Sequence, residues 1–323
     1  MPDIFYNRAG RVRSLWRLAA FGVAFLFAFN AAFLGTEFAA AFLLPRAVYE
    51  RLFVEGDVGF IIQSVLIFTP AALVGWACAR GFEDLPWRAL GWALHHGWLR
   101  DALAGLLVGG VSIALAALVG AVFGGYRFGL NSPGTLNVVA VARTLVTSGL
   151  VFLLGAAAEE MLFRGYPLQT LMRSWPLWVA LLPVSVPFAV VHLWNPNVVP
   201  GFTFANTVLA GVWLGVAYWR TRSLWFPLGV HTGWNWVQGA FLGSPVSGIT
   251  QITPAPLLRF VDAGPHWLGG GTYGIEGGAA CTLALLISTL FIWRTRLLSA
   301  TPELKEYTDA EIPNPDAPHV TPT

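Results

Sequence analysis

The chain has 323 residues, of which 56% are hydrophobic and 11% are charged. Soluble domains carry about a quarter charged residues, so this composition excludes an ordinary soluble protein and predicts several membrane-spanning helices. The formal net charge of +2 is too small to indicate a nucleic-acid partner. The two cysteines both lie in apolar runs, which argues against a disulfide framework or a cysteine-based metal site.

Eight apolar segments approach the length of about 20 residues that a membrane span requires. They cover residues 15–44, 58–79, 102–123, 138–158, 176–193, 205–219, 224–242 and 276–293. The first follows a basic tail, residues 1–14, and is far longer than a signal peptide's apolar region, so it predicts a retained anchor. The expected fold is an all-α polytopic transmembrane bundle. Residues 15–296 form its membrane domain, and the polar, proline-rich residues 297–323 predict a disordered tail.

The connections between spans carry several weaker signals. Residues 80–100 mix charged side chains with tryptophans and predict a helix lying on the membrane surface. In the next span, Gly105 and Gly109 form a small-xxx-small pair, which indicates close helix packing. The glycine- and proline-rich segment 243–275 predicts a long loop, and Glu276, at the end of this loop, is expected to be solvated.

The distribution of basic residues predicts the orientation of the spans. With a cytoplasmic N-terminus and eight spans, thirteen Arg and Lys residues fall in cytoplasmic segments. Five fall on the other side, namely Arg46, Arg51, Arg127, Arg143 and Arg259. We therefore expect a multi-pass protein of the cell membrane with both termini in the cytoplasm. The span at 224–242 is the least hydrophobic of the eight.

Two adjacent carboxylates and an arginine, Glu159, Glu160 and Arg164, occur where the fourth span ends. Ionisable groups at membrane depth are costly and usually mark a functional site. Residues four apart share a helical face, so Arg164 is expected to pair with Glu160. Glu159 is left without a partner in its own segment and is the candidate general base for activating water.

Two later apolar segments each contribute a histidine. His192 follows Phe188 by four residues, and His231 precedes Asn235 by four. His231 and Asn235 therefore share a helical face and can both donate hydrogen bonds, as a developing oxyanion requires. Taken singly, His192 could be a packing residue, and His231 with Asn235 could be a polar clamp between helices.

Together, these segments supply a base, a place for water and oxyanion donors, which is a complete hydrolase constellation. Two alternatives stay open from the residues alone. Glu159, His192 and His231 could instead hold a zinc ion with water in its open position. A non-enzymatic transporter or scaffold could use the same polar cluster as a relay, although no internal repeat of the kind many transporters show is evident.

The order Glu-Glu-x-x-x-Arg, Phe-x-x-x-His and His-x-x-x-Asn, each on a hydrophobic helix, resembles the CPBP family of intramembrane proteases. That family includes CAAX prenyl endopeptidases and bacteriocin-processing and Abi-type proteins. The resemblance covers residues 138–242, which would be the catalytic core. It implies that Glu159 activates water with help from His192, that His231 and Asn235 stabilise the oxyanion, and that Glu160, Arg164 and Phe188 support the site.

The resemblance further implies an endopeptidase that acts on a peptide or membrane-protein substrate within the lipid bilayer. The family has been discussed both as metalloproteases and as glutamate-dependent proteases. We expect the glutamate-dependent form without a cofactor, with the zinc-dependent form as the alternative. The chain has a bacterial character, so a prenylated substrate does not transfer directly, and the sequence is silent on oligomeric state.

Overall fold

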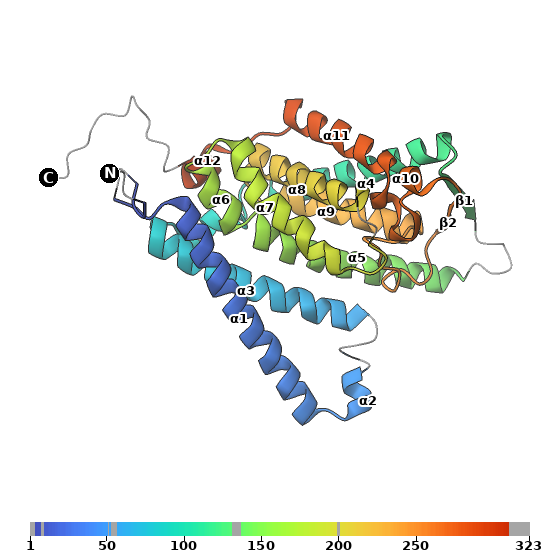
Figure 1. Ribbon diagram of the computed structural model, residues 1–323, viewed down its shortest axis with the longest axis horizontal. Helices are drawn as coiled ribbons and strands as arrows, with labels where there is room; N and C mark the ends of the chain where they lie inside the picture. The colour runs from blue at the N-terminus through green and yellow to red at the C-terminus, as the bar shows by residue number, and fades with distance from the viewer. Residues whose placement is uncertain are drawn as a thin grey trace.

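The computed structural model describes residues 4–7, 10–50, 52, 57–130, 137–198 and 201–309, and within them the chain forms a bundle of helices (Figure 1). Most of the bundle consists of α1 (Ser14–Leu43), α2 (Arg46–Tyr49), α3 (Asp57–Glu83), α4 (Trp98–Val122), α5 (Val138–Phe163), α6 (Tyr166–Met172), α7 (Leu177–Val191), α8 (Phe202–Thr221), α9 (Trp225–Trp236), α10 (His266–Gly269), α11 (Ala279–Arg294) and α12 (Pro302–Asp309). Shorter turns are the 3₁₀ segments η2 (Trp87–Leu90), η3 (His192–Trp194), η5 (Gly271–Tyr273) and η6 (Ile275–Gly277), and the π-helical η4 (Val237–Phe241).

Six helical segments in the described part of the chain are long and apolar enough to cross a membrane. They are α1, α3, α4, α5 with α6, α7 with η3, and α8. The predicted polytopic helical class is therefore confirmed, and the chain is a multi-pass membrane protein. The other two predicted spans correspond to the shorter α11 and to α9, which continues into η4.

Helix α9 lies inside the bundle rather than at its lipid surface. Nine consecutive residues, from Phe226 to Trp234, are buried. A helix surrounded by protein does not need an apolar outer face, which explains why this segment is the least hydrophobic of those predicted to span. The central position also allows α9 to present polar side chains to a site enclosed by other helices.

Glycines on α4 and α9 bring the two backbones into direct contact. A Cβ atom added to Gly109 would lie 1.9 Å from the carbonyl oxygen of Val230, and one added to Gly233 would lie 2.1 Å from that of Leu106. Gly105 and Gly229 are equally close to the facing backbone. The close packing predicted from Gly105 and Gly109 is thus confirmed, and it fixes the position of α9 against α4.

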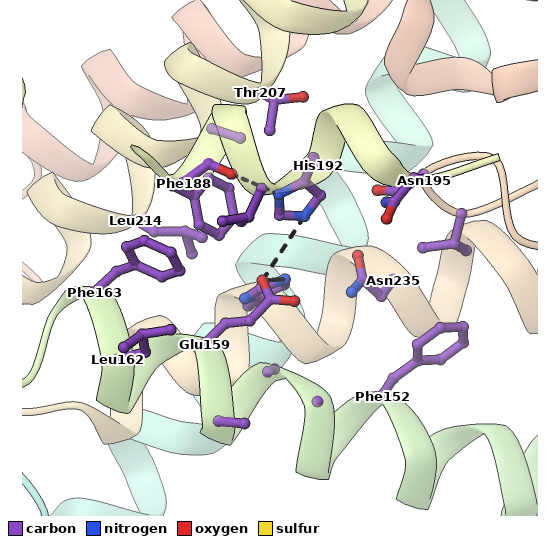
Figure 2. A pocket seen from close by; sticks show the side chains of 18 of the residues that line it. Phe152, Glu159, Leu162, Phe163, Phe188, His192, Asn195, Thr207, Leu214 and Asn235 are labelled. Atoms are coloured by element: carbon purple, nitrogen blue, oxygen red, sulfur yellow. Dashed lines mark hydrogen bonds and ion pairs between the residues drawn. The ribbon is translucent and has the colours of Figure 1, made fainter. Parts of the chain in front are cut away.

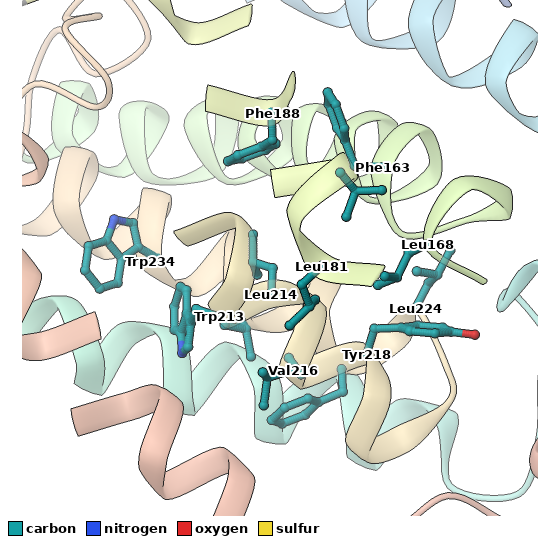
Figure 3. Packing of buried hydrophobic residues seen from close by; sticks show 14 of the residues in the cluster. Phe163, Leu168, Leu181, Phe188, Trp213, Leu214, Val216, Tyr218, Leu224 and Trp234 are labelled. Carbon is teal, nitrogen blue, oxygen red and sulfur yellow. The ribbon is translucent and has the colours of Figure 1, made fainter. Parts of the chain in front are cut away.

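A dense apolar cluster connects α7, α8 and α9 behind the candidate site (Figure 3). The indole rings of Trp213 and Trp234 meet edge to face with their centroids 5.3 Å apart. Leu181, Leu214 and Phe188 belong to the same cluster of buried side chains. This packing fixes the relative positions of α7, α8 and α9.

The first and third helices lean away from the rest of the bundle, as the blue helices of Figure 1 show. The buried residues of α1 are Ser14, Arg17, Phe21, Phe25 and Ala40, so its contacts are concentrated near its first turns. In α3, Ser64 is the first buried residue along the helix. The two helices therefore meet the core firmly at one end and diverge from it at the other.

A buried ionic cluster holds the start of α1 against the core of the bundle. Glu83 of α3 accepts hydrogen bonds from Arg17 at 2.6 Å, from Arg173 at 2.8 Å and from Thr170 at 2.9 Å. The side chains of Arg17, Glu83 and Arg173 are at most 1% exposed. Three segments far apart in sequence, the start of α1, the end of α3 and the end of α6, are joined by this one carboxylate.

Several regions outside the spans differ from expectation. The prediction of a surface helix at residues 80–100 is wrong. After α3, only η2 is helical before α4, because Gly91 and Gly97 adopt left-handed φ angles of 96° and 98°. His95, expected at the membrane interface, is buried, with its Nε2 atom 3.6 Å from Asp101 Oδ2.

The predicted outer loop and C-terminal tail also contain regular structure. Strand β1 (Tyr126–Leu130) pairs in antiparallel fashion with β2 (Leu258–Asp262), which folds part of the 243–275 segment back onto the bundle. In the tail expected to be disordered, α12 buries Leu304, and Glu303 contacts Arg88 at 2.8 Å. These contacts order the tail as far as residue 309, and residues 310–323 lie outside the described part.

Candidate active site

The two adjacent carboxylates at the end of α5 point in different directions. Glu160 is fully buried, whereas the Glu159 side chain is 32% exposed. Consecutive helical residues project about 100° apart, so one carboxylate faces the protein interior and the other faces open space. The Glu159 carboxylate therefore lines the cavity, whereas the Glu160 carboxylate does not.

Glu160 is the centre of a buried hydrogen-bond network. Its Oε1 atom accepts a hydrogen bond from Arg164 Nη1 at 3.1 Å, which is the contact expected from their spacing. The same oxygen lies 3.0 Å from Nδ1 of His231 on α9, a partner that sequence spacing did not identify. Arg164 also donates to the carbonyl oxygen of Gly211 on α8 at 3.2 Å. Glu160 and Arg164 together therefore connect α5 with α8 and α9.

The aromatic ring of Phe188 organises the side chains around it. The Arg164 guanidinium carbon lies 4.4 Å from the ring centroid, in a cation–π contact. The Phe163 ring meets Phe188 edge to face at 5.2 Å, and the His192 imidazole centroid is 4.6 Å away. Phe188 thus contacts both the buried arginine and the histidine one helical turn later.

His192 lies at the point where α7 gives way to η3. Pro183 and Pro187 interrupt the hydrogen-bond ladder of α7, which ends at Val191. The His192 Nδ1 atom lies 2.7 Å from the carbonyl oxygen of Phe188. A carbonyl oxygen can only accept, so Nδ1 carries a proton and the neutral ring keeps its lone pair on Nε2. This hydrogen bond sets both the orientation and the tautomer of the imidazole.

Glu159 Oε2 lies near both imidazole rings, and Figure 2 shows its contact with His192. It is 3.9 Å from Nε2 of His192 and 3.8 Å from Nε2 of His231. Both separations exceed a direct hydrogen bond, and this oxygen accepts no hydrogen bond from the described residues. A water molecule about 2.8 Å from each atom would bridge such gaps. The predicted residues from three helices therefore converge on one oxygen atom.

These side chains line a cavity of about 460 Å³. Asn235 of α9 also lines it, and Figure 2 shows its amide on the same side as Glu159 and His192. Phe25 and Leu26 of α1, with Gln63 of α3, line the same cavity. The site thus extends from the end of α5 to the two helices that lean away from the bundle.

The three candidate metal ligands do not have the spacing of a zinc site. Tetrahedral zinc, with bonds of about 2.1 Å, separates neighbouring ligand atoms by about 3.4 Å. Glu159 Oε2 is 3.8 Å or more from either histidine Nε2. Among the residues described, no group of three His, Cys, Asp or Glu side chains could hold a metal ion. In these positions, the side chains of Glu159, His192 and His231 fit a bridging water molecule better than a zinc ion.

The geometry agrees with a comparison against protein families. Residues 141–237 match the family model of type II CAAX prenyl endopeptidases described as Rce1-like. This segment is an Rce1-like domain. It runs from the first turn of α5 to the start of η4. The resemblance inferred from the three motifs is therefore confirmed for this part of the chain. No curated protein matches the chain.

The Rce1-like domain contains every residue that the sequence analysis placed in the site, but the cavity extends beyond it. Glu276 and Ser247, which follow the domain in sequence, also line the cavity wall. Glu276 was expected to be solvated at the end of a loop, and the structure places it half-buried on the cavity wall, hydrogen-bonded to Trp234 and Ser247. The only sequence signal for its position is its location immediately before the apolar segment that forms α11.

Proposed function

We propose that the protein is an intramembrane endopeptidase in which Glu159 activates a water molecule for attack on a peptide bond. The observation that carries this proposal is the position of Glu159 Oε2, within 4 Å of Nε2 of both His192 and His231 on the wall of one cavity. The family match supports a peptidase, and the separation of the three side chains supports water rather than metal at their centre.

In the proposed reaction, water donates a hydrogen bond to Glu159 and is oriented by the lone pair on His192 Nε2. Glu159 takes a proton from this water as its oxygen adds to the carbonyl carbon of the substrate. The resulting tetrahedral oxyanion then collapses, the carbon–nitrogen bond breaks, and the proton passes from Glu159 to the leaving nitrogen. Each proton and electron pair is accounted for without another reactant.

His231 and Asn235 stabilise the oxyanion in this scheme. Nδ1 of His231 faces Glu160 at 3.0 Å, and Nε2 faces the cavity. A doubly protonated ring would therefore donate to Glu160 through one nitrogen and to the oxyanion through the other. Glu160 and Arg164 would act by fixing the ring in this orientation, without contacting the substrate. The Asn235 amide supplies a second donor on the same wall.

The orientation in the membrane is part of the proposal. The contact between Arg17 and Glu83 brings the start of α1 to the end of α3, and Arg88 contacts Glu303 of α12 at the same end of the bundle (Figure 1). These are segments that the positive-inside rule assigns to the cytoplasm. Both termini would therefore be cytoplasmic. The substrate would be a peptide or a membrane-protein segment, and prenylation is not assigned to it.

The function is tested by comparing membrane peptides and small membrane proteins from cells that carry the intact protein or its Glu159→Ala variant. Cells with the intact protein should contain specific cleavage products that the variant lacks, with the uncleaved precursors accumulating in the variant. Equal membrane insertion of both proteins is the required control. Identical fragment patterns at equal expression would contradict a peptidase activity that depends on Glu159.

Chelation provides a separate test of the water-based mechanism. Because the three candidate ligands are spaced too widely for zinc, purified protein treated with a strong chelator should retain its cleavage rate. Rates are measured before treatment, after treatment and after zinc is added back. Loss of activity on chelation with recovery in zinc would replace the glutamate mechanism by a metal-dependent one.

A further inference from the structure

A third carboxylate, that of Glu276, lies on the cavity wall formed by the loops after the Rce1-like domain. It belongs to η6, just before α11. Its Oε1 atom accepts a hydrogen bond from Trp234 Nε1 at 3.0 Å, and its Oε2 atom accepts from the backbone and the hydroxyl of Ser247, the latter at 3.0 Å. The carboxylate is therefore held in one orientation by two neighbouring segments.

The donors that hold Glu276 are all neutral. An ionised carboxylate can accept about four hydrogen bonds, and three are occupied, which leaves capacity for a ligand. Within the described residues, no Lys or Arg lines the cavity, whose other ionisable side chains, Glu159, His192 and His231, form the proposed catalytic group. A half-buried carboxylate that is hydrogen-bonded only by neutral groups creates a local negative potential that a cation beside it would neutralise.

Glu276 is also linked directly to the helix that carries the site. Trp234 immediately precedes Asn235 and follows His231 by three residues. The neighbouring wall carries the polar side chains of Asn195 and Thr207, whereas Phe25 and Leu26 line the cavity on the α1 side. The cavity thus has an acidic, hydrogen-bonding region around Glu276 and an apolar region beside α1. Glu159 also lines this cavity.

We infer that Glu276 forms a specificity subsite that binds a cationic side chain of the peptide substrate, lysine or arginine. This inference rests on the proposed peptidase function and adds a substrate class to it. The apolar wall would hold a hydrophobic stretch of the same peptide. The subsite disfavours an anion in the same place, whether an acidic side chain or a free C-terminal carboxylate, because a second negative charge would be repelled there.

Binding of a designed peptide series tests the subsite. Fluorescent peptides share one apolar sequence in which a single lysine, or its neutral and nearly isosteric counterpart norleucine, is moved through every position. Binding is measured by anisotropy with the Glu159→Gln protein, which prevents cleavage and leaves Glu276 as the carboxylate in the cavity. At one position in the peptide, which defines the register of binding, a lysine peptide should bind about tenfold more tightly than the norleucine peptide, as expected for one charge pair. Glutamate in that register should bind more weakly than norleucine.

Adding Glu276→Gln should remove the preference for lysine while leaving norleucine peptides bound as before. The matched control is Glu37→Gln, which removes a carboxylate from α1 outside the cavity lining and should leave the preference intact. A purely structural role for Glu276 would lower stability without changing the lysine-to-norleucine ratio. The peptide comparison with Glu276 present remains informative even if the glutamine variant fails to fold.

Two results would overturn the subsite, namely no register with a lysine preference, or a preference that survives Glu276→Gln. The peptidase proposal fails by a different result. If the protein with Glu159 intact cleaves none of the peptides but the lysine preference is present in the binding assay, the subsite stands and the catalytic proposal does not. The two inferences are therefore separated by the same set of peptides.

Discussion

Replacing Glu159 by glutamine is expected to lower the cleavage rate by about 100-fold or more. The substitution keeps the shape of the side chain but removes the ability to take a proton from water, and general-base catalysis contributes about 10²–10⁴ to rates. Because Glu159 Oε2 accepts no hydrogen bond from the described residues, the protein should still fold. The measurement is the steady-state cleavage rate of purified protein in liposomes, with kcat and KM determined separately.

Glu37→Gln is the matched control, because it removes the same charge from a span without altering the cavity wall. The activity of Glu37→Gln should equal that of the unmodified protein.

His192→Ala and His231→Ala should each abolish cleavage, since each ring faces the Glu159 oxygen. Full activity in Glu159→Gln would remove this residue from the reaction and leave the cavity without a base.

The largest effect on stability is expected from Glu83→Gln. This change removes the negative charge shared by Arg17 and Arg173, whose guanidinium groups are buried with it. Removing one partner of a buried ion pair costs about 3–5 kcal/mol, because the other charge stays buried without compensation. The free energy of unfolding, measured by denaturant titration in mixed micelles, should fall by this amount, and α1 should become more accessible to protease.

The exposed contact between Arg88 and Glu303 is the control for the Glu83 cluster. Their side chains are 53% and 45% exposed, and exposed ion pairs contribute about 0–1 kcal/mol. Glu303→Gln should therefore change stability by less than about 1 kcal/mol. Equal effects of Glu83→Gln and Glu303→Gln would show that the buried cluster does not hold α1 to the core.

Much of the fold and of the site's composition could be predicted because it depends on local sequence. Apolar segments longer than a bilayer crossing identify spans without tertiary information, and the spacing of Gly105 and Gly109 indicated a close helix contact that the structure contains. Spacing of four likewise placed Arg164 beside Glu160. The roles assigned to Glu159, His192, His231 and Asn235 stay predictions, although the structure brings all four to one cavity.

The features that sequence reasoning missed join residues far apart in the chain. Arg17 and Glu83 are separated by 66 positions, and Trp234 and Glu276 by 42. Single charges in loops or near helix ends give no indication of such partners. The pairing of β1 with β2 was missed for the same reason. The predicted surface helix at 80–100 failed because two glycines with positive φ, Gly91 and Gly97, turn the chain inward.

The rest of the chain leaves most of the second half of α1 uncovered, so lipid would cover it in a membrane. From Leu26 to Leu43, only Ala40 is buried by the rest of the chain. Leu26 also lines the cavity, so acyl chains would form part of the boundary of the site. The tilt of a long, weakly held helix follows the thickness of the surrounding bilayer through hydrophobic mismatch. Membranes of different thickness would therefore change the position of α1 at the cavity wall, which would make lipid composition a determinant of substrate access.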